Sequence, residues 1–148
     1  MILLVHMLFG AVFGTIIKNP ILAIFLALLG HYFLDIFPHI EYSISNIRNK
    51  NWRESLPDWL KVVLDFLLGL LIIFLFSKNN PLIYICGFVA LIPDALTIIS
   101  DLFPNRLLHI HDIIHTQKIH YLTKQKNFPV FWKIFSQVLV TVISIILL

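Results

Sequence analysis

Five long apolar segments restrict the possible folds of this chain more than any other feature. A helix that crosses a bilayer needs about 20 apolar residues, and in lipid only a helix satisfies the backbone hydrogen bonds of such a segment internally. We therefore expect an all-α protein, a single transmembrane bundle of about five spans. The expected spans, each bounded by charged, Asn or Pro residues, are 2–17, 20–37, 59–76, 81–103 and 129–148.

Composition supports this interpretation. Apolar residues make up 59% of the chain and charged residues 13%, with a mean hydropathy of +0.90, which is far from the usual mix of a soluble domain. Five spans would use most of the 148 residues, so we expect one domain over residues 1–148. Cys86 is the single cysteine, which excludes an internal disulfide and a thiolate zinc cluster.

The first apolar segment is expected to stay in the mature protein. It lacks a basic n-region and a small-residue cleavage site, both of which a signal peptide requires. Gly10 and Gly14 within it form a small-xxx-small pair, which lets a neighbouring helix approach closely.

Basic residues predict the orientation. With five spans, the N-terminus and the two long connections, 41–58 and 104–127, lie on one side of the membrane. Nine of the eleven Lys and Arg residues lie on that side, so the positive-inside rule places it in the cytoplasm and the C-terminus outside. A basic rim beside anionic lipid accounts for the net charge of +3 without any nucleic acid, and it would also attract an anionic substrate.

Under this topology the histidine and acidic side chains gather near the cytoplasmic face. An ionisable group within a span costs about 2.5–3.5 kcal/mol on insertion scales, so each needs a partner or water. Four separate parts of the chain provide such groups at similar depth, which favours pairing among them. The residues concerned are His6, His31, Asp35, His39, Asp65, Asp94, Asp101, His109, His111, Asp112, His115 and His120.

Local spacing indicates metal binding. His31, Asp35 and His39 are spaced four apart, so they share one helix face, although Pro38 is expected to distort the step to His39. A His and a carboxylate one turn apart can ligate one divalent cation. His111 and His115 repeat this spacing if their segment is helical. Mixed imidazole and carboxylate ligands suit zinc, iron, manganese and nickel, and more than four candidate ligands allow a two-metal site.

Several of these residues also have an interpretation without a metal. Asp65 can pair with Lys61, four residues before it, and Asp94 can cap a helix that resumes after a kink at Pro93. His6 and His39 can be interfacial side chains. Solvated positions would account for Asp101, Asp112 and His120.

Several stretches together resemble a known family. They are the run Gly30-His31-Tyr32-Phe33-Leu34-Asp35-Ile36-Phe37-Pro38-His39, the early His6, Asp65, Ile92-Pro93-Asp94 and the His-rich segment 109–115. In these the chain is similar to small bacterial proteins related to the membrane-bound metal-dependent hydrolases typified by the YdjM inner-membrane protein. The resemblance implies metal ligation by His6, His31, Asp35, Asp94 and His115, with Asp65 and His111 as further candidates.

The expected function is a metal-dependent hydrolase acting on a phosphoester of a lipid or other amphiphile at the cytoplasmic face of the inner membrane. Coordination to one or two divalent ions, zinc first and manganese or iron as alternatives, lowers the pKa of water to about 7. Asp35 or Asp94 would act as ligand or general base, and Arg106 would steer the phosphate.

Two functions from different classes stay open. The same groups suit a metal or proton carrier, although the outer halves of the spans are almost wholly apolar. They also suit a structural membrane protein in which a polar cluster locks helices together. The chain has no His-Glu-x-x-His, Gly-x-Ser-x-Gly or P-loop motif.

Overall fold

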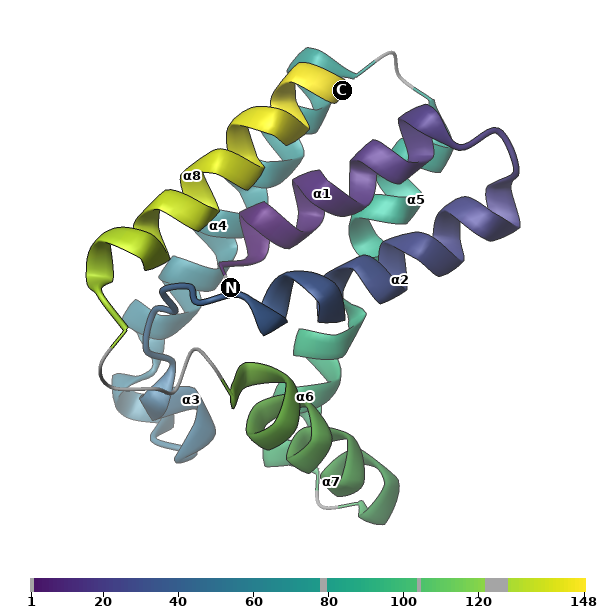
Figure 1. Ribbon diagram of the computed structural model, residues 1–148. Helices are drawn as coiled ribbons and strands as arrows, with labels where there is room; N and C mark the ends of the chain where they lie inside the picture. The colour runs from purple at the N-terminus through teal and green to yellow at the C-terminus, as the bar shows by residue number, and fades with distance from the viewer. Residues whose placement is uncertain (1, 78–79, 104, 122–127) are drawn as a thin grey trace.

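The computed structural model describes residues 2–77, 80–103, 105–121 and 128–148 (Figure 1). Throughout these residues the regular elements are helical and no strand is present, which confirms the all-α prediction. The elements are α1 (Leu3–Ile16), α2 (Pro20–Ile36), α3 (Ser45–Arg48), η1 (Trp52–Glu54), α4 (Leu56–Phe76), α5 (Pro81–Val89), α6 (Ile92–Leu102), α7 (Arg106–Ile113), η2 (Ile114–Lys118), η3 (Ile119–Tyr121) and α8 (Val130–Leu147).

Asparagine side chains cap the start of three helices. Asn19 Oδ1 accepts hydrogen bonds from the first amides of α2, and Asn80 and Asn105 do the same for α5 and α7. A cap of this kind satisfies amides that have no partner within the helix. Pro20 and Pro81 follow two of these caps, at a position where a proline loses no helical hydrogen bond.

Helix α1 forms the centre of the bundle. It packs against α2, α4, α5 and α8, and Figure 1 shows it (purple) crossing the middle of the molecule between these helices. Val5, Met7, Leu8 and Ala11 of α1 have no exposed surface. Most side chains of α1 are therefore placed among other helices rather than facing the surroundings.

Two glycines allow α1 to lie directly against α5. A Cβ atom added at Gly14 would lie 2.6 Å from the Cα of Ile83, and one added at Gly10 would lie 2.7 Å from the Cys86 carbonyl oxygen. Both distances are shorter than any side chain tolerates, and the groups met are backbone atoms that cannot move aside. The close helix approach expected at Gly10 and Gly14 is thus present, and the helix that approaches α1 there is α5.

Several helices have the character of membrane spans. Helices α4 and α8 are long and apolar enough to cross a bilayer, and few of their side chains are buried within the molecule. The pair α5 and α6 adds a third span if the two count as one. Helices α1 and α2 are apolar but shorter, at 14 and 17 residues.

The expected span 81–103 is broken in the middle. Helix α5 ends at Val89, and α6 starts at Ile92 at an angle of 43° to it. Pro93 explains the break, because it has no N–H to donate to the carbonyl of Val89 and its ring would clash there. Asp94 lies in the first turn of α6, but no side chain caps this helix, so the capping interpretation of Asp94 was wrong.

Candidate metal centre

Asp35 lies in the last turn of α2, is fully buried, and is surrounded by imidazoles from α1, α2, η2 and η3. Its Oδ2 atom lies 3.0 Å from Nε2 of His31, 3.1 Å from Nε2 of His115 and 3.0 Å from Nε2 of His120. Its Oδ1 atom lies 3.1 Å from Nε2 of His6. The four imidazoles thus come from parts of the chain up to 114 residues apart, as the positions of His6 and His120 show.

The break between α5 and α6 fixes the orientation of His31. The carbonyl oxygen of Ala90, at the break, lies 2.7 Å from Nδ1 of His31. A carbonyl only accepts, so Nδ1 carries the proton and donates. In the neutral ring, Nε2 then presents its lone pair to Asp35.

Thr97 of α6 fixes His115 in the same way. Its hydroxyl donates to the Pro93 carbonyl at 3.2 Å, and its oxygen lies 3.1 Å from Nδ1 of His115. Because the single hydroxyl proton is used, Thr97 accepts from Nδ1, and Nε2 of His115 is left with a lone pair. This Nε2 lies 3.0 Å from Nε2 of His31. Two lone pairs and a carboxylate therefore face one another, an arrangement that a cation stabilises.

Four of these residues have the spacing of metal ligands. One ligand atom each from His31, Asp35, Asp94 and His115 lies within 4.8 Å of the others. Hydrogen bonds on the outer nitrogens of the two rings are the usual support of metal-bound imidazoles. These groups, of which all but Asp94 are buried, can hold a metal ion, and all four belong to the set predicted from the sequence.

His6 lies beside this group. Its ring stacks on that of His31, with the centroids 4.0 Å apart. Its Nε2 is 3.1 Å from Asp35 Oδ1, but neither ring nitrogen makes a hydrogen bond among the described residues. A buried polar atom without a partner is unfavourable, and coordination to a cation near Asp35 would satisfy it.

Asp65 and His111, the two further candidates, lie outside the ligand group. Asp65 Oδ2 accepts from the backbone N–H of Leu4 and from the Tyr42 hydroxyl, both at 3.3 Å. Lys61 pairs with Asp58 at 3.1 Å, and the alternative pair of Lys61 with Asp65 is absent from the ion pairs of the described chain.

His111 lies next to the ligand group without joining it. Its ring stacks on that of His115 at a centroid distance of 5.4 Å, so the two residues share a face as their spacing predicted. Its Nε2 lies 3.2 Å from the hydroxyl of Tyr32. His111 therefore packs against a candidate ligand and helps to place it.

A second ligand group shares Asp35. Ligand atoms of Asp35, His39 and His120 lie within 4.8 Å of one another, and His120 is only 7% exposed rather than solvated as expected. The π-helical turn η2 places His120, because its i→i+5 hydrogen bonds bring residues five apart, such as His115 and His120, toward the same side. An α-helical spacing rule cannot find such a pair.

Two groups outside the candidate spans show how strongly this cluster interacts. Burial alone would lower the pKa of His120, but its hydrogen bonds to Asp35 and Glu41 outweigh burial and raise the pKa to about 9. Burial would raise the pKa of Glu41, but hydrogen bonds from His120 and His39 hold it well below its usual range. Glu41 is therefore a carboxylate at neutral pH.

A cleft of about 440 Å³ opens beside the centre. Its lining combines polar groups of the cluster with a guanidinium and apolar side chains. Arg106, expected to steer a phosphate, is not among the residues that line the cleft. The polar and apolar residues that line the cleft include Asp94, His115, His120, Arg48, Ile44 and Ile98.

Comparison with known proteins gave no match. Neither a protein-family model, nor a curated protein, nor a solved structure matches this chain.

Proposed function

We propose that this protein is a membrane-bound metal-dependent hydrolase that cleaves a phosphoester of a lipid or other amphiphile at the cytoplasmic face. One observation carries the proposal. His31, Asp35, Asp94 and His115 converge with metal-ligand spacing beside a cleft that also contains Arg48. The family resemblance to YdjM-like hydrolases points in the same direction.

The proposal includes five spans in the inner membrane. Helices α1 and α2 would cross together with α4, the α5–α6 pair and α8, with the N-terminus and both long connections in the cytoplasm. Two facts support this topology. Nine of eleven Lys and Arg residues fall on the proposed cytoplasmic side. The end of α2 also meets the turns η2 and η3 at Asp35, as expected if they lie at the same face.

Zinc is the proposed ion, with manganese or iron as alternatives, because the donors are imidazole nitrogens and carboxylate oxygens. His31, Asp35, Asp94 and His115 would hold it, and His6 is placed to join them. A bound ion supplies an acidified water and a positive charge for the phosphate oxygens.

The exposure of the side chains indicates their roles in the proposed reaction. Asp35 is fully buried, so it acts as a ligand, whereas the side chain of Asp94 is 21% exposed and lines the cleft. Asp94 can therefore also accept the proton of the attacking water. Arg48 would bind the phosphate, and Ile44 and Ile98 would contact the apolar part of the substrate.

A second candidate function is purely structural. Asp35 contacts imidazoles from four elements, and a protonated cluster of this kind would hold the helices together without any ion. Metal content separates the two accounts, because the structural account requires no metal.

The test of the hydrolase is a turnover assay with protein purified in detergent, stripped with a chelator and reloaded with Zn²⁺. Phosphate release from phosphatidic acid micelles is expected only in the reloaded protein. Asp94→Asn should lower kcat by about 10²–10⁴. Arg48→Ala should mainly raise KM, and His109→Ala, in an exposed position of α7, should change neither. Metal-loaded protein that cleaves neither phosphomonoester nor phosphodiester lipids contradicts the proposed reaction.

A further inference from the structure

We propose that His39, His120 and Glu41 form a second metal subsite, which shares Asp35 with the first and makes the centre binuclear. This inference rests on the proposed metal centre and deepens it. From the sequence, His39 was placed on the helix face of His31 and Asp35 but also had an interfacial interpretation, whereas His120 had a solvated interpretation and Glu41 had no assigned role.

The ring of His39 lies beside two carboxylates, and its neutral form offers them a lone pair on Nε2. Its Nδ1 lies 2.8 Å from the carbonyl oxygen of Phe37, which only accepts, so Nδ1 carries the proton. In the neutral ring, Nε2 is unprotonated and lies 2.9 Å from Glu41 Oε1 and 3.8 Å from Asp35 Oδ1. A cation between these atoms would have all three groups as ligands, which is the arrangement already described for His31 and His115.

His120 completes the subsite. Its Nε2 faces Asp35 Oδ2 at 3.0 Å, and its Nδ1 lies 2.7 Å from Glu41 Oε1. A carboxylate on the outer nitrogen fixes the tautomer of a metal-bound imidazole and raises its basicity. Glu41 therefore orients His120, and its oxygen also lies within reach of an ion held by His39.

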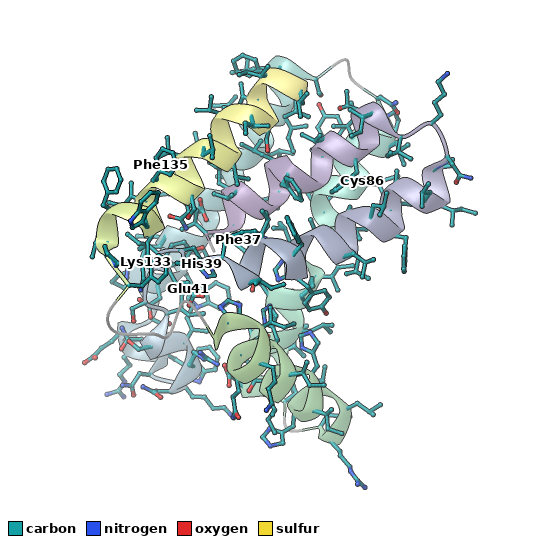
Figure 2. All side chains as sticks on the ribbon, viewed as in Figure 1. Phe37, His39, Glu41, Cys86, Lys133 and Phe135 are labelled. Carbon is teal, nitrogen blue, oxygen red and sulfur yellow. The ribbon has the colours of Figure 1, made fainter. Side chains whose placement is uncertain are left out.

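The backbone holds this subsite in place. Helix α2 ends at Ile36, before Pro38, so His39 lies in the extended segment that follows the helix. The following segment is tied to α8, because Ser136 donates to the Pro38 carbonyl and Gln137 donates to the Ile40 carbonyl, both at 2.7 Å. Figure 2 shows His39 and Glu41 beside the first turns of α8, which carry Lys133 and Phe135.

The burial of its imidazoles supports a preformed second subsite. His39 is 1% exposed and His120 is 7% exposed, so both rings are removed from water. Glu41 and His120 also line the cleft, so the second subsite has access to the same space as Asp94. Two ions that share a carboxylate suit a phosphoester, because they neutralise both the attacking and the leaving oxygen.

The rival account replaces the second ion with protons. A doubly protonated His120 would donate to both Asp35 and Glu41, and a proton on Nε2 of His39 would do the same toward Glu41. Both accounts fit the distances, but they differ in the number of ions bound.

The experiment is a Mn²⁺ titration of the chelator-stripped protein at pH 7.5, with bound metal counted by elemental analysis and the signal followed by EPR. Wild type should bind two equivalents and show the exchange-coupled spectrum of a Mn²⁺ pair. His39→Ala and His31→Ala should each bind one equivalent and show an uncoupled six-line spectrum. His109→Ala, which changes an exposed histidine of α7, should behave as wild type.

The outcomes separate this inference from the proposed function. One equivalent in wild type and still one in His39→Ala overturns the second subsite and leaves the first intact. Two equivalents in both wild type and His39→Ala also overturn the second subsite. Loss of both ions from His39→Ala overturns it as well. No bound ion in folded wild type overturns the metal centre and the proposed function together. Glu41→Gln, which preserves the shape of Glu41, provides a second variant if His39→Ala does not fold, and it should weaken one binding step only.

Discussion

The two halves of α2 lie in opposite surroundings. In its first half Ala23 and Ala27 are buried with Cys86 of α5 in a cluster of small apolar side chains. In its second half His31 and Asp35 are buried among imidazoles and carboxylates. The first region is stabilised by close packing, so added side-chain volume should destabilise the fold there. In the second region, metal binding depends on which nitrogen atoms carry protons. A substitution that keeps the volume but removes a hydrogen-bonding group should therefore weaken metal binding there.

Gly14→Ala should produce the largest effect, in the apolar region. The added side chain meets backbone atoms of Ile83 that cannot move, and overpacking of this kind costs about 3 kcal/mol or more in the free energy of unfolding. Gly69→Ala is the matched control, because the added Cβ meets the flexible Met7 side chain, with its sulfur 3.1 Å away. Denaturant unfolding in detergent measures both. Equal losses at the two positions would contradict a volume-limited contact between α1 and α5.

Thr97→Val sharpens the comparison from the polar side. The change keeps the volume but removes the acceptor for Nδ1 of His115, so we expect metal affinity to fall about 10–100-fold, as for other outer partners of ligands. Thr116→Val is the matched control, since that hydroxyl donates only to the Asp112 carbonyl among the bonds of the described chain. Competition with a fluorescent chelator gives both affinities. Unchanged affinity in Thr97→Val would mean that the proton position on His115 is unimportant.

Two helix caps should give the smallest effects. Asn19→Ala and Asn105→Ala each remove one cap, which is worth about 1 kcal/mol of stability. Asn105 starts α7, which leads to His115, so its loss should also weaken metal binding roughly fivefold, equivalent to about 1 kcal/mol. Asn19 lies at the apolar end of α2 and should leave metal affinity unchanged. Equal affinities for the two variants would contradict a centre that depends on α7.

The sequence predicts the apolar helices and part of the candidate centre, and the reason is regular geometry. Apolar length indicates helices in lipid, and the four-residue spacing of His31 and Asp35 places both on the inner face of α2. His115 follows from the same rule within its own segment. These predictions need no knowledge of how the helices meet.

Two of the features that the sequence did not predict lie where the backbone leaves regular α-helix, and two others depend on how side chains pair and segments pack. His39 follows the end of α2, and His120 follows the π-helical turn η2, so neither obeys α-helical spacing. Lys61 pairs with Asp58 instead of Asp65, although both spacings fit a helix. The position of Arg48 at the cleft depends on how distant segments pack. In the sequence, only Pro93 and Pro38 indicated these breaks in the helices. A proline shows where a helix is interrupted, but it does not show in which direction the chain continues.

Metal content tests the central claim most directly. Elemental analysis would compare purified wild type with the His31→Ala, Asp35→Ala double variant and with His109→Ala, after confirming by circular dichroism that all three are folded. The account predicts at least one equivalent of a divalent transition metal in wild type and in His109→Ala, and none in the double variant. Folded wild type that binds no metal even after reloading would contradict it and leave the helix-locking cluster as the explanation of these buried histidines.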